Sequence, residues 1–462
     1  MKNMSLKEIS TACGGVYWGD EESYHKEVSS VTIDSRKVEK GSLFIAIRGA
    51  RVDGHTFIPQ VMEAGALCSL SEDPIEDAPF PYILVNSCEQ ALKDIAAHYR
   101  QALGIKVVGI SGSVGKTSTK EMIGSVLSQK YSVLKTAGNF NNEIGLPLTV
   151  FNIREEHEVA ILEMGISDFG EMTRLAKIAR PDVCVLTNIG CAHLEQLGDR
   201  DGILKAKTEM FDYMNSEGIV ILNGDDDKLS TITSVHGKSP IVFGLSSERD
   251  VYATDIENLG LKGTTCTLHL PDMELTATIH IPGAHMVYNA LAGASVGRAL
   301  GLNADEIKAG IEALVPISGR NNMIETNGLT IIDDCYNANP ASMRASLDVL
   351  ATATTRKVAI LGDMFELGND ADVLHYEIGV HAVKSGIDVI CCIGKLSRKI
   401  ALGAQSTVSP SRVLSYKTKA DFLADAPSVI HPGDAILIKA SHSMEFPELV
   451  ESLQHINLKH VE

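Results

Sequence analysis

Short apolar runs alternate with polar, glycine-containing turns along the whole chain, and the spacing of the runs changes twice. In residues 1–103, the runs at 31–33 and 43–47 predict short strands, and the stretch at 88–102 predicts a helix. Because strands and a helix occur together here, we expect a small α/β domain in this segment.

Residues 104–318 begin with a β-branched run at 105–110, followed by glycines and a helical stretch at 116–130. The order strand, glycine loop, helix predicts a central parallel sheet of the P-loop, mononucleotide-binding type. Further apolar runs predict buried strands at 159–162, 183–187 and 219–222, strand alternation marks 251–281, and small residues predict a helix at 285–300.

Residues 319–462 alternate strands and helices again, which predicts a Rossmann-like, doubly wound domain. The predicted strands are 329–332, 358–361, 389–393 and 435–439, and the predicted helices are 341–350, 372–384 and one starting at Met444. The fold class expected for the whole chain is therefore α/β with three domains, at roughly 150 residues per domain.

Composition narrows the class of protein. A formal charge of -18 with no basic run argues against a nucleic-acid partner. The nine cysteines are scattered without a C-x-x-C pattern, so we expect reduced thiols rather than a zinc site. The start shows no signal peptide and no stretch reaches about 18 apolar residues, so we expect a cytoplasmic protein without a membrane span.

The strongest chemical signal is the loop Gly112-Ser113-Val114-Gly115-Lys116-Thr117. Glycines let the backbone N–H groups point at a phosphate, Lys116 can neutralise the β/γ oxygens, and Thr117 can reach a Mg²⁺. In the common form four residues separate the two glycines, but here Ile110 stands where the first glycine belongs. The shorter G-x-x-G-K-T form resembles the loop of Mur ligases and folylpolyglutamate synthetases, and this resemblance favours an amide-forming ligase over a motor or GTPase.

Three ionisable residues could serve a metal site. Glu163 ends a predicted buried strand, where an acid faces the ligand crevice, and Mg²⁺ prefers oxygen ligands. His193 follows the next strand, and Lys207 lies on a predicted helix. From the residues alone, an ordinary strand-end acid, a loop histidine and a solvated lysine remain alternatives.

Two further positions could contact a nucleotide. His285 and Asn289 are four residues apart and share a helix face, where an amide could read adenine through paired hydrogen bonds; helix packing is the alternative. Arg320 lies at the boundary between the second and third segments and suits phosphate charge in a transition state; a boundary salt bridge is the alternative.

These motifs together resemble the Mur ligase family, and the resemblance covers most of the chain. It implies that ATP activates a carboxylate as an acyl phosphate for attack by an amine. It also implies two Mg²⁺ ions and a carbamylated Lys207, formed when CO₂ adds to the neutral amine and creates an anionic ligand. The implied catalytic residues are Lys116, Glu163, His193, Lys207 and Arg320, and the implied metal ligands are Thr117, Glu163, His193 and carbamylated Lys207.

The resemblance also assigns ligand contacts. Asn289 would contact adenine, Asp334 the ribose, and Arg320 the γ-phosphate. The full ATP set is Gly112, Ser113, Gly115, Lys116, Thr117, Ser118, Asn289, Arg320, Asp334 and Tyr336, and the set for the UDP-linked substrate is Ser35, Arg36, Gly54, His55 and Asn142.

The loop Tyr336-Asn337-Ala338-Asn339-Pro340 resembles the branch of the family that adds D-alanyl-D-alanine to UDP-N-acetylmuramoyl-tripeptide. The D-N-P-R motif of the neighbouring branch is not found in the sequence. His442 departs from the family, which usually has arginine there.

The expected domains are 1–103 for the UDP-sugar-peptide, 104–318 for ATP and 319–462 as the Rossmann-like ligase domain, in a monomer. Another Mur branch, a folylpolyglutamate synthetase-like ligase and a P-loop phosphotransferase remain alternatives.

Overall fold

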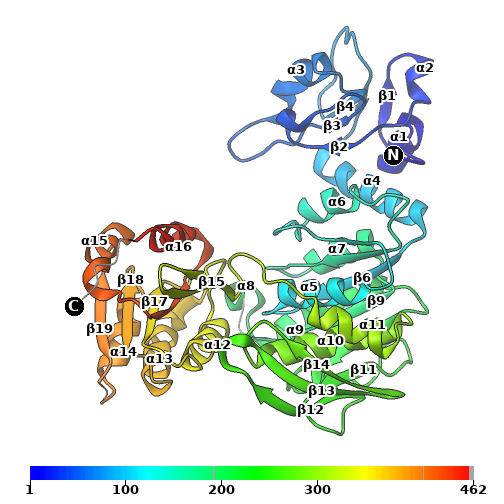
Figure 1. Cartoon of the computed structure of the whole chain (residues 1–462). Coiled ribbons are helices and arrows are strands. Elements are labelled where there is room, and N and C mark those ends of the chain that lie inside the picture. Colours follow the sequence, from blue (N-terminus) through cyan, green and yellow to red (C-terminus); the bar gives the residue numbers. More distant parts are fainter. Residues whose placement is uncertain (191–192, 409, 457–462) are drawn as a thin grey trace. The chain divides into compact units, whose positions relative to one another are not determined.

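The computed structural model describes residues 1–190, 193–408 and 410–456 (Figure 1). Two compact units divide these residues. Unit 1 comprises Met1–Ser111, Tyr131–Val185 and Ala206–Ile219, and unit 2 comprises Gly112–Lys130, Leu186–Lys205 and the chain from Val220 onward. Among the described residues, no helix is both long and apolar enough to cross a bilayer.

Unit 1 contains a five-stranded N-terminal sheet in the order β1-β5-β4-β3-β2, in which only β1 runs antiparallel to its neighbour. Its strands are β1 (Val16–Trp18), β2 (Val31–Thr32), β3 (Leu43–Ile45), β4 (Cys68–Ser71) and β5 (Tyr82–Leu84), and its helices are α1 (Leu6–Cys13), α2 (Glu21–Tyr24) and α3 (Ile58–Glu63). β3 is buried along its whole length, which places the core of this domain under the predicted run at 43–47.

Unit 1 also contains strands in the order β9-β6-β8-β7, with β6, β8 and β7 parallel. These are β6 (Lys106–Ser111), β7 (Val133–Lys135), β8 (Val159–Glu163) and β9 (Val183–Leu186), with helices α4 (Cys88–Leu103), α6 (Gly145–Val150) and α7 (Glu171–Ala179). α4 packs against α6 and α7, and the buried Tyr99 hydroxyl donates to the Ile153 carbonyl at 2.7 Å.

Unit 2 begins with α5 (Lys116–Leu127), which packs against α10 (His285–Ala299) and α11 (Ala304–Glu312). Small residues in α10 permit this approach, because a Cβ on Gly293 would lie 2.9 Å from the Met122 side chain. Strands follow in the order β14-β13-β12-β11-β10, namely β10 (Ile219–Asn223), β11 (Ile241–Gly244), β12 (Val251–Asn258), β13 (Thr264–Leu270) and β14 (Met273–Ile279).

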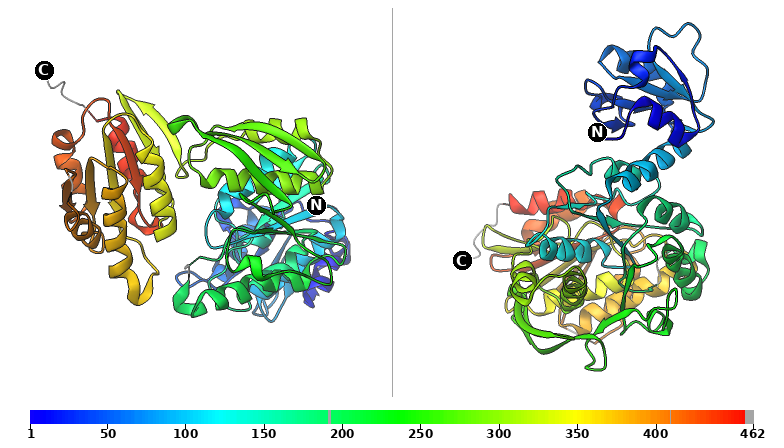
Figure 2. Two further views of the ribbon diagram at one scale, coloured as in Figure 1. Left: turned by 90° about the horizontal axis from the view of Figure 1, so that it is seen from below. Right: turned by 90° about the vertical axis from the view of Figure 1, so that its right-hand side faces the viewer.

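The C-terminal part of unit 2 is a six-stranded sheet in the order β15-β16-β20-β17-β18-β19, parallel except for β15 (Figure 2). Its strands are β15 (Asn322–Thr326), β16 (Leu329–Asp333), β17 (Lys357–Gly362), β18 (Val389–Ile393), β19 (Arg412–Tyr416) and β20 (Ala435–Lys439). Its helices are α12 (Pro340–Ala351), α13 (Ala371–Lys384), α14 (Arg398–Gln405), α15 (Lys419–Val429) and α16 (Pro447–Gln454).

Alternate residues of these strands enter two separate cores, one on each face of the sheet. On β17, Ala359 and Leu361 pack with α12, α13 and α14, whereas Val358 and Ile360 pack with α15 and α16. Helices therefore cover both faces, as a doubly wound sheet requires.

The expected α/β class is confirmed, as are the predicted strands and most of the predicted helices. The helix expected from Met444 was misplaced, because His442–Met444 forms a 3₁₀ turn and α16 starts at Pro447, a favourable first helical residue. The edge strands β15 and β19 were missed because no residue of either strand is fully buried.

Candidate functional site

A cavity of about 350 Å³ lies within unit 2 and gathers several of the predicted ATP residues. Its wall includes Gly115 and Ser118 at the start of α5, Asn289 on α10, Arg320, and Asp334 at the end of β16. Chain segments far apart in the sequence thus meet around one space. The dimensions are those of a small-molecule site.

The phosphate loop has the backbone geometry that glycine permits. Gly112 and Gly115 have φ of +151° and +82°, and a Cβ on Gly112 would collide with the Thr187 hydroxyl. Gly115 precedes α5, and no side chain among the described residues caps that helix. The N-terminal amides of α5 can therefore bind an anion. The Lys116 ammonium donates to the Gly112 carbonyl at 2.8 Å, which folds it over the loop.

Asn188, which lies outside this loop in the sequence, is hydrogen-bonded to the loop backbone. Its carbonyl accepts from Ser113 N–H at 3.0 Å, and its Oδ1 accepts from Val114 N–H at 2.9 Å. Its Nδ2 donates to the Val114 carbonyl at 2.8 Å. Because both loop amides are engaged in this way, the anion-binding amides are those of Gly115 and the first turn of α5. The sequence alone predicts that the loop amides as a whole serve the phosphate, and the structure narrows that set.

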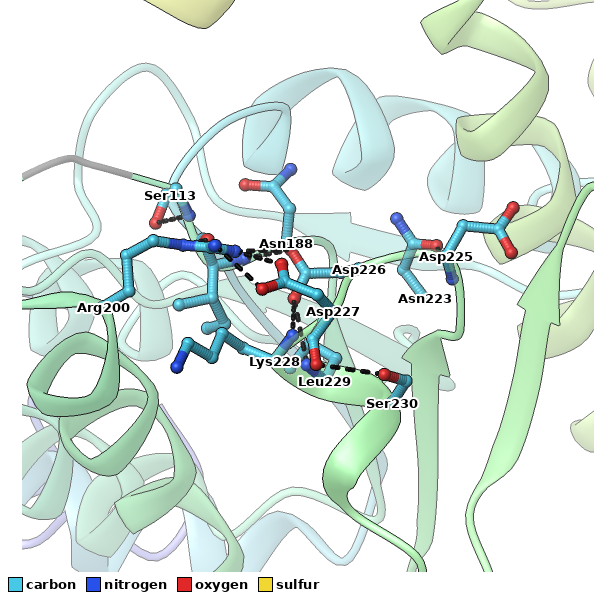
Figure 3. A network of polar contacts seen from close by, with 12 residues as sticks. Ser113, Asn188, Arg200, Asn223, Asp225, Asp226, Asp227, Lys228, Leu229 and Ser230 are labelled. Carbon is cyan, nitrogen blue, oxygen red and sulfur yellow. Dashed lines mark hydrogen bonds and ion pairs between the residues drawn. The ribbon is translucent and has the colours of Figure 1, made fainter.

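A polar turn after β10 holds the segment that carries Asn188 (Figure 3). Asp226 accepts from Ile189 N–H at 2.8 Å and from Lys228 N–H at 3.0 Å, and Gly190 N–H donates to Ser113 Oγ at 2.9 Å. The loop at 113–114, the segment at 188–190 and the turn at 226–228 thus form one connected network. Sequence reasoning missed Asn188 and Asp226, although Asn188 directly follows a predicted strand.

Asn289 lies in the cavity wall and is 6% exposed. Thr119 on α5 donates to its Oδ1 at 2.8 Å, and Asn289 Nδ2 donates to the Met286 sulfur at 3.1 Å. Helix α5 therefore orients the amide that the resemblance assigns to adenine, and a second Nδ2 hydrogen remains for a ligand.

Asp334 is buried in a charged cluster beneath the cavity. Its carboxylate accepts from Lys439 Nζ at 2.6 Å, from Ser346 Oγ at 2.5 Å and from Asn321 N–H at 3.3 Å. Burial lowers the pKa of Lys439, and the neighbouring Asp334 charge opposes that shift. Lys439 also lines the cavity and was not among the predicted site residues.

Arg320 and Tyr336 form a stacked pair, with the guanidinium carbon 4.1 Å from the centroid of the tyrosine ring. Gly319 N–H donates to Asp333 at 2.7 Å, which ties the boundary arginine to the end of β16. Arg320 lines the cavity. Among the described residues, its guanidinium packs on the tyrosine ring and does not form the boundary salt bridge that was the alternative.

Two of the predicted metal ligands, Glu163 and Lys207, lie in unit 1. Glu163 ends β8 and is 2% exposed; its Oε1 accepts from Asn141 Nδ2 at 2.8 Å. A buried, oriented carboxylate suits Mg²⁺, which prefers oxygen donors. Lys207 is equally buried, on α9 (Arg200–Thr208), rather than the solvated lysine of the alternative interpretation.

The other two, Thr117 and His193, lie in unit 2. Thr117 is in the first turn of α5, where its hydroxyl is an oxygen donor of the kind Mg²⁺ accepts. His193 precedes α8 (Leu194–Leu197) with a left-handed φ of +61°, and its Nδ1 lies 3.5 Å from Glu366. Across residues 1–190, 193–408 and 410–456, no three His, Cys, Asp or Glu side chains group closely enough to hold a metal ion.

The predicted substrate residue Arg36 lies in an exposed turn with Ser35, and its guanidinium makes two hydrogen bonds to Asp34, at 2.9 and 2.8 Å. These bonds lower the pKa of Asp34 to about 2. The arginine side chain is 87% exposed, so it can still be reached by a ligand.

The remaining substrate candidates support local structure. His55 lies 2.7 Å from Asp53 through Nδ1, and its Nε2 accepts from Glu72 N–H at 2.9 Å. Gly54 leaves no room for a side chain, because a Cβ would lie 2.7 Å from a backbone oxygen. Asn142 Oδ1 accepts from Gly145 N–H at 2.8 Å, which starts α6.

Three family models match the chain. They are the Mur ligase middle domain at residues 110–297, the Mur ligase family catalytic domain at 27–100, and the Mur ligase glutamate ligase domain at 319–442. Together they match well over half of the sequence.

Named relatives agree with these models. The UDP-N-acetylmuramoyl-tripeptide–D-alanyl-D-alanine ligase of Bacillus subtilis is 38% identical over 92% of this chain and 93% of its own. MurF from Acinetobacter baumannii superposes with a TM-score of 0.90 at 32% identity, covering 98% of this chain and 99% of that one. The MurF ligase of Thermotoga maritima in complex with ADP gives a TM-score of 0.82 at 30% identity, covering 92% and 97%. This chain belongs to the Mur ligase family.

Proposed function

We propose that this chain is an ATP-dependent ligase that joins D-alanyl-D-alanine to UDP-N-acetylmuramoyl-tripeptide during the cytoplasmic synthesis of peptidoglycan precursors. The observation that carries the proposal is the cavity of unit 2, where the start of α5, Asn289, Arg320 and Asp334 surround one space. The Bacillus subtilis relative bears the name of this activity, and the Thermotoga maritima structure contains ADP.

A carboxylate needs activation before an amine can displace one of its oxygens. In the proposed reaction, a carboxylate oxygen of the tripeptide attacks the γ-phosphorus of ATP, and the bond from that phosphorus to the β–γ bridging oxygen breaks. ADP leaves and an acyl phosphate forms. Lys116 and Arg320 stabilise the charge on the transferring group, an effect worth roughly 10²–10³ in rate for one donor.

The D-alanyl-D-alanine amine then attacks the acyl carbon, phosphate departs with the carbon–oxygen electron pair, and the nitrogen loses a proton. The products are an amide, ADP and phosphate, and no covalent enzyme intermediate is required. Water must be kept from the acyl phosphate, which suggests domain closure around the reactants.

Mg²⁺ bound with ATP would supply positive charge to the phosphate oxygens. We expect two Mg²⁺ ions to bind, and we assign as their ligands Thr117, Glu163, His193 and carbamylated Lys207. The buried Glu163 carboxylate and the position of Thr117 in the first turn of α5 support the assignment. The burial of Lys207 suits carbamylation, because a neutral amine reacts with CO₂.

We assign the UDP-linked substrate to residues 1–103, with Ser35, Arg36, Gly54 and His55, and to Asn142. The proposed domain limits are 1–103, 104–318 and 319–462. The matched family models, at 27–100, 110–297 and 319–442, fall within those limits.

The test is product analysis with two UDP-N-acetylmuramoyl-tripeptides, one with lysine and one with diaminopimelate at the third position. Each is incubated with MgATP, with and without D-alanyl-D-alanine. We expect amine-dependent ADP release and one amide product by mass spectrometry. ADP release that ignores the amine would indicate a phosphotransferase, and amide formation only from a folate and glutamate would indicate the folylpolyglutamate synthetase alternative.

A further inference from the structure

The loop that carries Asp334 and Tyr336 is held by the chain segment that follows β20. Lys439, the last residue of β20, donates to the Asp334 carboxylate at 2.6 Å and to the Asn337 carbonyl at 3.0 Å. These two bonds fix the ends of the loop at 334–337. In the middle of the loop, Tyr336 N–H donates to the Gly319 carbonyl at 3.2 Å, and the Tyr336 carbonyl contacts a different residue.

That residue is His442, three positions after Lys439 in the 3₁₀ turn His442–Met444. Its Nδ1 lies 3.2 Å from the Tyr336 carbonyl, and its backbone N–H donates to Asn337 Oδ1 at 3.3 Å. A carbonyl can only accept, so Nδ1 carries the hydrogen and donates it. One exposed side chain therefore restrains the backbone of the tyrosine.

The side chain of Tyr336 transmits this restraint toward the cavity. Its ring centroid lies 4.1 Å from the Arg320 guanidinium carbon and 5.3 Å from the His442 ring centroid, with the two rings inclined by 42°. Arg320 makes its ring contact with the same tyrosine that His442 holds. A shift of Tyr336 would thus move the ring against which the Arg320 guanidinium packs.

We propose that His442 is a positioning residue of the ligase reaction, which places Arg320 through the Tyr336 carbonyl and ring. The inference rests on the proposed function, because it assumes that Arg320 meets the transferring phosphoryl group. His442 itself touches neither reactant. Its effect belongs to the chemical step, because the interaction it supports forms with the transferring phosphate.

The experiment replaces His442 by Asn, Gln and Ala in the full chain. Asn keeps an N–H donor at the position of Nδ1, Gln moves the donor one bond further out, and Ala removes it. Steady-state kinetics of amide formation would give kcat and KM for ATP and for the UDP-tripeptide. We expect H442A and H442Q to lower kcat about tenfold with little change in KM for the UDP-tripeptide, and H442N to stay within about threefold of the parent.

Two controls separate positioning from folding. His381, on α13, contacts Asp348 at 2.7 Å through a partly buried ring outside the cavity lining, so H381A should leave kcat unchanged. The second control is the pair Y336A and Y336A/H442A. If His442 acts through the tyrosine ring, its removal should cost much less in the Y336A background.

The inference is overturned if H442A keeps the parental kcat, or if H442N is impaired as much as H442A. It is also overturned if the His442 variants lose kcat only as far as their melting temperatures fall, because lost stability would then explain the lost activity. Failure of the parent protein to form any amide is a different result, because it removes the proposed function rather than the role of His442.

Discussion

The cavity of unit 2, proposed to bind ATP, depends on contacts between distant parts of the sequence. Thr119 and Asn289 are 170 residues apart, and Lys439 and Asp334 are 105 apart, yet each pair is joined by a short hydrogen bond. Val114 is bonded to Asn188 across 74 residues. The site residues are therefore positioned by the fold of the whole unit.

The substrate candidates in unit 1 bond mainly to near neighbours instead, and the exception is His55, whose Nε2 accepts from Glu72 N–H across 17 residues. Arg36 bonds to Asp34 and His55 to Asp53, in each case two residues away, and Asn142 bonds within its own turn. Such contacts shape a turn but do not converge on one point. A ligand phosphate could displace the Asp34 carboxylate from Arg36 without disturbing a core.

The difference indicates that the cavity of unit 2, proposed to bind ATP, is organised before binding, whereas the turns of unit 1 proposed to bind substrate would exchange local partners for a ligand. Preorganised donors are the larger source of catalytic power. Substitutions in the cavity should therefore affect rate or stability strongly, and substitutions in the unit 1 turns should act mildly, through substrate binding.

The largest effect is expected from Lys116. K116M removes the cation that lies over the phosphate loop, and kcat for amide formation should fall on the order of 10²–10³-fold. Stopped assays of ADP and of amide would measure it. K308A, which alters an exposed lysine on α11, serves as the control. If K116M retained more than a tenth of the activity, the claim that the cavity of unit 2 is organised before binding would be wrong.

The next effect concerns the buried pair of Lys439 and Asp334. K439M leaves the Asp334 carboxylate buried without its cation, which should destabilise unit 2 by roughly 3–5 kcal/mol. Calorimetry should show a lower transition temperature.

The matched control is K439M/D334N, which removes both charges and should recover most of the lost stability. An equal loss in the single and double variants would mean that Lys439 contributes packing rather than charge compensation.

A smaller effect is expected from Asn188. N188A removes the acceptor of the Val114 N–H and one of the two donors to the Val114 carbonyl, which Thr187 Oγ1 still reaches at 2.8 Å. The phosphate loop should therefore loosen, and ATP affinity should fall about tenfold to a hundredfold. Titration calorimetry with MgATP or ADP measures it. N152A removes an exposed amide that donates to the Leu148 carbonyl of α6 at 3.0 Å, away from the phosphate loop, and this variant should bind normally. Unchanged affinity in N188A would show that the loop holds its shape without outside support.

The same distinction decides what the sequence could reveal. Gly112, Lys116 and Glu163 stood out because they lie in recognisable local patterns beside predicted strands, and Arg320 stood out through its boundary position and the family resemblance. Asn188 and Lys439 also lie at the ends of predicted strands, but with Asp226 they belong to no recognisable motif, because their partners are set by how distant parts of the chain meet. The edge strands β15 and β19 escaped notice for a related reason, since a half-buried strand shows a weak hydrophobic pattern.

The smallest effect tests the unit 1 turn directly. Two hydrogen bonds from Arg36 lower the pKa of Asp34 from 3.8 to about 2, so R36A should return that pKa toward 3.8. A carboxyl whose folded pKa is lowered stabilises the fold above its unfolded pKa, and that stabilisation is lost as the pH falls from about 4 to about 2. Both groups are at the surface, so melting at pH 7 should hardly change. NMR titration of the Asp34 carboxyl carbon measures the shift, with R51A as the control for loss of a nearby exposed arginine. If R36A instead lowered kcat as much as K116M, Arg36 would contribute to the chemical step as strongly as a cavity residue. The contrast between the unit 2 cavity and the unit 1 turns would then fail.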